Sequence, residues 1–88
     1  MEKVFNTLAS ELMKDSSVKG VLCADEKGDS LYHRGTLNSN SAAVSAQLTA
    51  LSANLEPNSQ PIIILNSSSS KVILTNNGPI TTAVHKQL

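Results

Sequence analysis

The residues that could perform chemistry are few. Cys23 is the single cysteine, and His33 and His85 are the only histidines. Cys23 and His33 could serve as the nucleophile and base of a thiol-dependent enzyme. However, the pair lacks an orienting third residue and any oxyanion element, and cysteines inside strands are commonly inert. We therefore expect Cys23 to be a buried hydrophobe in a reducing compartment, with the thiol-dependent enzyme using Cys23 as the weaker alternative.

Metal and cofactor motifs are missing from the sequence. Neither histidine has Cys, Asp or Glu nearby at the spacing that metal ligation requires. Asp25, Glu26 and Asp29 cluster in one short segment, but they lack the spacing of a calcium loop and are better read as solvated turn charges. Neither glycine-rich phosphate-binding motif occurs. We expect no enzyme, and no catalytic residue, metal or cofactor.

Composition narrows the classes of partner. Seven Lys and Arg balance seven Asp and Glu in 88 residues, and 2% of the residues are aromatic. The scattered basic residues give no electrostatic footprint for nucleic acid or an anionic membrane. The chain has neither an apolar stretch of membrane-spanning length nor a lipidation motif. We expect one domain over residues 1–88, located in the cytoplasm and attached to a membrane only through another component.

The first half of the chain predicts a helix and a hairpin. Apolar residues recur from Glu2 to Lys14 at helical spacing. Strand-like segments follow at Val18–Asp25, which is apolar on both faces in its middle, and at Ser30–Gly35. The intervening turn contains Gly28, a residue type that accepts positive φ.

The second half predicts another helix and three strands. Its helix is expected to be capped by Asn40 or Ser41 and to end before Pro57. The β-branched run Pro61–Leu65 is typical of a central strand covered on both faces. Two further strands are expected on either side of a turn at residues 76–78, namely Lys71–Thr75 and Ile80–His85. The predicted order is α-β-β-α-β-β-β, an α/β (α+β) fold.

The second helix has two apolar sides and no charged residue between Ala42 and Leu55. On a helical wheel, one stripe is expected to face the core of the chain, namely Val44, Leu48, Leu51 and Leu55. A stripe of small residues lies roughly 150° away and suits close packing against a helix of a second chain, namely Ala43, Ala46, Ala50 and Ala53. The alternative is that alanine, the best helix former, is simply exposed there.

The isoleucine-rich strand supports the idea of a partner chain. If Ile62–Leu65 lay at a sheet edge it would be an aggregation hazard unless it were covered or paired. Pairing with the equivalent strand of a partner would remove that edge and align the two alanine stripes. On this interpretation, Ala46→Glu or Ala50→Glu is expected to abolish assembly.

Three segments resemble a known family. The run from Gly20 to Leu31, GVLCADEKGDSL, the following Arg34–Leu37, RGTL, and Ile80–Lys86, ITTAVHK, closely resemble the hepatitis B virus X-interacting protein family. This family is the fifth subunit of Ragulator, the late-endosomal and lysosomal adaptor complex. The likeness extends over nearly the whole chain and is weaker over residues 51–61 and 66–71.

The resemblance implies the Roadblock/LC7 fold: a five-stranded antiparallel sheet with helices on one face and, here, no C-terminal helix. Members of the family are scaffolds that pair with another Roadblock subunit through the second helix and third strand. Carried over by position, those are Ala42–Leu55 and Ile62–Leu65. The partner interface is therefore expected to include Ala43, Ala46, Gln47, Ala50, Ala53, Asn54, Ile62, Ile63 and Ile64.

The resemblance also implies a cellular role. Such heterodimers are held by a lipid-anchored wrapping subunit and support Rag GTPase recruitment and amino-acid signalling to the mTOR complex 1 kinase. The chain would then lie on the cytosolic face of the lysosome and late endosome through the complex. The alternative is a homodimeric Roadblock-type module that binds a small GTPase or a motor complex, and the isolated chain could pair with itself. The family's association with viral X protein and survivin maps to no residue of this sequence.

Overall fold

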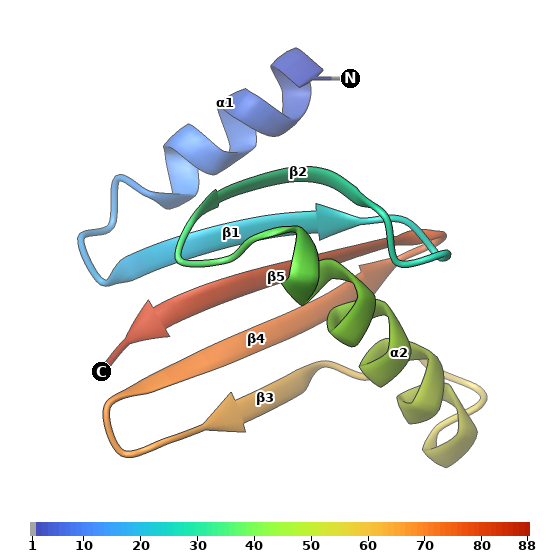
Figure 1. Ribbon diagram of the computed structural model, residues 1–88. Coiled ribbons are helices and arrows are strands. Elements are labelled where there is room, and N and C mark those ends of the chain that lie inside the picture. Colours follow the sequence, from blue (N-terminus) through green and yellow to red (C-terminus); the bar gives the residue numbers. More distant parts are fainter. Residues whose placement is uncertain (1) are drawn as a thin grey trace.

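The helices and strands follow one another in the predicted order in the computed structural model, which describes residues 2–88 (Figure 1). The predicted hairpin strand Ser30–Gly35 has the predicted bounds, and most other ends differ by one or two residues. The elements are α1 (Glu2–Leu12), β1 (Val18–Ala24), β2 (Ser30–Gly35), α2 (Ser39–Leu55), β3 (Ile63–Asn66), β4 (Ser70–Asn77) and β5 (Ile80–Gln87).

All five strands form one antiparallel sheet in the order β2-β1-β5-β4-β3. The prediction that the isoleucine-rich run is a central strand was wrong, because β3 pairs only with β4 and lies at the sheet edge. Ile64 and Leu65 of this edge strand are exposed.

The two helices lie on opposite faces of the sheet, so the expectation of helices on one face was wrong. Val21 and Val84 are register partners that pack in a cluster with Ala9 of α1. Their neighbours Leu22 and Ala83 pack in a second cluster on the α2 side. Because successive side chains of a strand point to opposite faces, these two clusters place one helix on each side.

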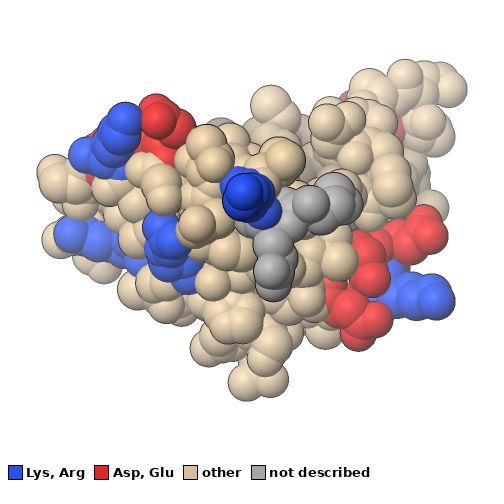
Figure 2. All heavy atoms as spheres, turned by 90° about the horizontal axis from the view of Figure 1, so that it is seen from above, with Lys and Arg blue, Asp and Glu red and all other residues tan. Residues whose placement is uncertain are grey.

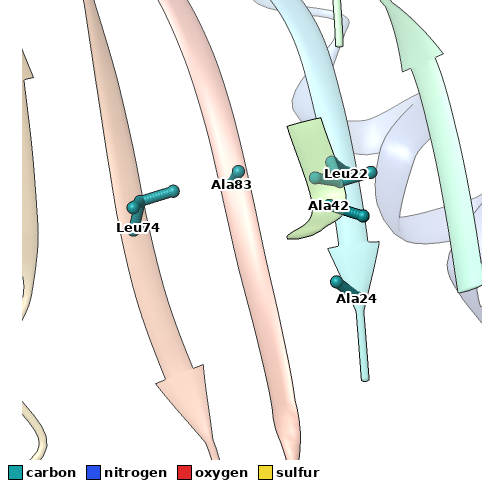
Figure 3. Packing of buried hydrophobic residues seen from close by; sticks show 5 residues of the cluster. All are labelled: Leu22, Ala24, Ala42, Leu74 and Ala83. Atoms are coloured by element: carbon teal, nitrogen blue, oxygen red, sulfur yellow. The ribbon is translucent and has the colours of Figure 1, made fainter. Parts of the chain in front are cut away.

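The core cluster on the α2 side is small, and its residues are buried. Leu22 is 0% exposed, and it packs with alanines from β1, β5 and α2 and with one leucine of β4 (Figure 3). Small residues at these positions let α2 approach the sheet closely. The five clustered residues are Leu22, Ala24, Ala42, Leu74 and Ala83.

The second helix begins earlier than expected. Its N-cap is Asn38 and not Asn40 or Ser41, because the Asn38 side chain accepts a hydrogen bond from the Asn40 N–H at 2.9 Å. The Asn38 N–H in turn donates to Ser41 Oγ, which completes a capping box.

The last hairpin turns one residue later than predicted. Asn77 still pairs with Ile80, so the loop consists of Gly78 and Pro79. Gly78 has φ of 61°, a left-handed conformation that a glycine adopts without strain.

Candidate protein–protein interface

The face of α2 that packs on the sheet is made of small residues. Ala42, Ser45, Ala46 and Thr49 are its buried residues. Thr49 Oγ1 donates to the backbone oxygen of Ala46 at 2.9 Å and lies 3.2 Å from Thr81 Oγ1 on β5. These hydrogen bonds satisfy the buried hydroxyl groups, so the small polar residues can face the sheet without a large desolvation cost.

The large apolar residues of α2 point away from the sheet, so the predicted core stripe was wrong. Leu51 is 62% exposed, Leu55 is 84% exposed and Val44 is also exposed, whereas Leu48 is half-buried against the core cluster. The helical wheel correctly grouped these four residues, but it assigned the group to the wrong environment. Neighbouring exposed apolar residues are typical of interaction surfaces, which makes this face of α2 a candidate interface.

The predicted interface residues of α2 have different surroundings in the structure. Ala46 is only 9% exposed and faces the sheet, so its placement on an outward alanine stripe was wrong. The other helix residues of the predicted interface are exposed, namely Ala43, Gln47, Ala50, Ala53 and Asn54.

The edge strand β3 has apolar residues on both faces of the sheet, with Ile63 and Leu65 on the α2 side and Ile64 on the α1 side. Ile62 and Ile64 are exposed and Ile63 is half-buried, where it packs against the α2-side core. A groove of about 420 Å³ separates α2 from the β3–β4 hairpin. Its apolar walls are Leu37, Val44, Leu48, Leu65, Val72 and Leu74. We call α2's outward residues, this groove and the free edge of β3 the α2–β3 surface.

A second apolar row crosses the sheet on the α1 side. Ile64 pairs with Ile73, Ile73 with Val84, and Val84 with Val21. The packing contacts of α1 reach Val21 and Val84, while Ile64 is 53% exposed. The β3–β4 part of this row therefore lies outside the cluster that α1 covers.

The geometry separates the residues that could have formed a thiol enzyme. Cys23 pairs with Tyr32 in the hairpin, whereas His33 pairs with Leu22. The thiol and the imidazole therefore belong to opposite faces of the sheet, and they cannot form the dyad considered from the sequence. Cys23 is buried, as predicted, and burial raises the pKa of its thiol, which makes it less reactive.

Within residues 2–88, no group of three or more His, Cys, Asp or Glu side chains could hold a metal ion. The described part of the chain also contains no helix that is both long and apolar enough to cross a membrane. Among the described residues, α2 and residues 62–65 carry more of the exposed large apolar side chains than the rest of the chain.

The fold is that of the Roadblock/LC7 domains. A Roadblock/LC7 domain from Streptomyces avermitilis superposes with a TM-score of 0.69 at 15% identity, over 81% of this chain and 67% of that one. MglB of Myxococcus xanthus superposes with a TM-score of 0.74 at 20% identity, over 88% of this chain and 70% of that one. Both share the architecture described above.

Sequence comparison then gives the particular family. Residues 1–86 match the family described as Ragulator complex protein LAMTOR5. A LAMTOR5 homolog of Nematostella vectensis and LAMTOR5 of Xenopus tropicalis are each 34% identical over 88 residues, covering 98% of this chain and 97% of theirs. The chain therefore belongs to the LAMTOR5 family, whose named members are Ragulator complex proteins.

Proposed function

We propose that this chain is a non-enzymatic adaptor subunit of the Ragulator complex whose α2–β3 surface pairs with another Roadblock-fold subunit. The observation that carries the proposal is the row of exposed leucines on α2 beside an unpaired apolar strand edge. A partner that adds a strand to β3 would satisfy the free backbone groups of that edge and cover the exposed Leu65, which lines the groove beside α2. Membership of the LAMTOR5 family supports the same complex.

The complex gives the chain its proposed role. The pair supports recruitment of Rag GTPases and thereby amino-acid signalling to the mTOR complex 1 kinase. The chain acts on the cytosolic face of the lysosome and late endosome, to which a lipid-anchored wrapping subunit attaches the complex. The apolar row on the α1 side, where Ile64 and Ile73 are register partners, is the surface that we assign to the wrapping subunit.

The test is affinity capture of the tagged full-length chain from cells, followed by mass spectrometry. We expect a Roadblock-fold subunit of Ragulator at equal amount, with the wrapping subunit and Rag GTPases at lower amounts. Leu51→Glu is expected to remove the Roadblock partner, because it would bury an unpaired carboxylate in the contact. Leu31→Glu is the matched control, because Leu31 is also exposed but belongs to β2 at the other sheet edge.

Two outcomes would contradict the proposal. Recovery of the chain only with itself would favour a homodimeric module over a Ragulator subunit. Equal loss of the Roadblock partner in Leu51→Glu and Leu31→Glu would show that the α2–β3 surface has no special role.

In cells that depend on the wild-type chain, Leu51→Glu is also expected to reduce the amount of Rag GTPase on lysosomes.

A further inference from the structure

A hollow of about 220 Å³, lined by residues with polar side chains, lies at one end of the sheet on the α2 side, apart from the α2–β3 surface. The side chains around it come from β1, the segment after β2, the loop between β3 and β4, the start of β4, and β5. They are Lys19, Thr36, Ser69, Ser70, His85 and Gln87. Two of them can carry positive charge, the others are hydroxyl or amide groups, and none is a carboxylate.

Gly20 lies next to two of the residues that line this hollow, Thr36 and His85. Gly20 pairs with Gly35 on one side and with His85 on the other. A Cβ atom on Gly20 would collide with Thr36 Oγ1, so only glycine lets Thr36 lie this close to β1. The Thr36 N–H donates to the backbone oxygen of Lys19 at 3.0 Å, and Thr36 Oγ1 is 2.6 Å from His85 Nδ1.

The charges around the hollow are unevenly distributed. Figure 2 shows mostly basic side chains toward one end of the molecule and mostly acidic ones toward the other, with side chains of the opposite sign at both ends. At the basic end, Lys86 pairs with Asp15 at 3.5 Å. Lys71 and Lys86 are register partners whose side chains alternate with those of Val72 and His85, so both lysines belong to the α1 side. Lys19, which is exposed, is the lysine that lines the hollow on the α2 side.

We propose that this hollow binds a phosphoryl group carried on a serine or threonine side chain of a partner protein. An ammonium group, an imidazole and several hydroxyl groups surround a space that is open to solvent and free of lining carboxylates. A phosphoryl group offers three acceptor oxygens and a charge near −2, and the lysine, hydroxyl and amide groups around the hollow are donors for such oxygens. An anionic membrane is disfavoured, because the lysines of this end point to both sides of the sheet and not to one plane.

The test is an NMR titration of the full-length chain, in complex with its Roadblock partner where the two purify together. The probe is N-acetyl-O-phosphoserine methylamide, and N-acetylserine methylamide is its unphosphorylated control. We expect saturable shifts of the amides of Lys19, Thr36, Ser70 and His85 with the phosphorylated probe alone. Inorganic phosphate is expected to compete with it, because the phosphoryl group is the part that is recognised.

Variants locate the binding to the hollow. Lys19→Met is expected to weaken binding about tenfold, the effect of about 1.4 kcal/mol for one lost charge-assisted hydrogen bond. Lys19→Arg should retain binding, and Lys71→Met should change it less than about twofold, because Lys71 lies on the other side of the sheet.

Three results would overturn the proposal. The first is the absence of a saturable shift with the phosphorylated probe. The second is an equal loss of binding in Lys19→Met and Lys71→Met. The third is binding to vesicles that contain phosphatidylinositol phosphate, with the same dependence on both lysines and no response to the phosphoserine probe, which would indicate a membrane contact instead.

Discussion

The β1–β5 half of the sheet and the β3 edge contain similar apolar residues in opposite environments. Val21 and Leu22 are adjacent on β1, and each is covered by a different helix. Ile64 on β3 and Leu51 on α2 are more than half exposed. The apolar residues of the first region are covered by other residues of the same chain. Those of the second region are similar in type but are exposed to solvent. Apolar residue type therefore indicates burial, but it does not say which chain provides the cover.

The largest effect on stability is expected in the first region. Leu22→Ala should lower the free energy of unfolding by about 3 kcal/mol, because it leaves a cavity among well-packed neighbours. Leu51→Ala, its counterpart in the second region, should change the stability of the isolated chain by less than about 0.5 kcal/mol. Urea unfolding of both variants measures the contrast, and similar losses of stability would remove the distinction between the two regions.

A pair of glutamate substitutions separates folding from assembly on a single helix. Ala46→Glu places a carboxylate against the sheet and should prevent stable folding, whereas Ala50→Glu places one in solvent. Ala50→Glu should keep the circular dichroism and unfolding transition of the wild type but lose the Roadblock partner. Light scattering of the co-expressed proteins measures whether the Roadblock partner is still bound. A folded Ala46→Glu variant would contradict the rotation of α2 described here.

The reactivity of Cys23 tests how completely the β1–β5 half is closed. The raised pKa of the buried thiol leaves less thiolate near neutral pH, and the surrounding core blocks access. Alkylation of the native protein should be at least about a hundredfold slower than that of the chain in denaturant, because labelling requires opening of the core. Equal rates in the two states would show that this half is open.

The smallest effect on stability is expected from a substitution in the exposed segment between α1 and β1. Hydrogen bonds from Ser17 Oγ and from the Ser17 N–H, together with the Lys86 ammonium group, lower the pKa of Asp15. The stabilisation is therefore present above the pKa that Asp15 has in the unfolded chain, and it is lost as pH falls through the lower folded value. Ser17→Ala should move this pKa back toward its ordinary value, which a carboxyl NMR titration measures. An unchanged titration curve would show that Ser17 does not set the pKa.

The order of elements and the burial of Cys23 could be predicted from the sequence, because they depend on local periodicity and turn residues. The sequence also contains a pattern that indicates helices on opposite faces of the sheet. The run Val21–Ala24 is apolar at every position, and such a strand needs cover on both faces. The family resemblance outweighed this signal, and the expectation of helices on one face followed.

The orientation of α2 could not be predicted, because the rule that large apolar residues face the core assumes a single chain. The α2 residues that are buried against the sheet are alanine, serine and threonine, whereas Leu51 and Leu55 are exposed. The same assumption led to the prediction that β3 is a central strand. Its run of isoleucines is consistent with a strand that becomes central only after a partner pairs with it.

The most direct test is hydrogen exchange at the β3 edge, measured for the isolated chain and for its complex with a Roadblock-fold subunit. The backbone amides of Ile63–Asn66 that do not bond to β4 should exchange rapidly in the isolated chain and slowly in the complex, together with slower exchange along α2. Unchanged exchange at these amides in a complex of confirmed mass would contradict the account, because the partner would then be bound somewhere other than the α2–β3 surface.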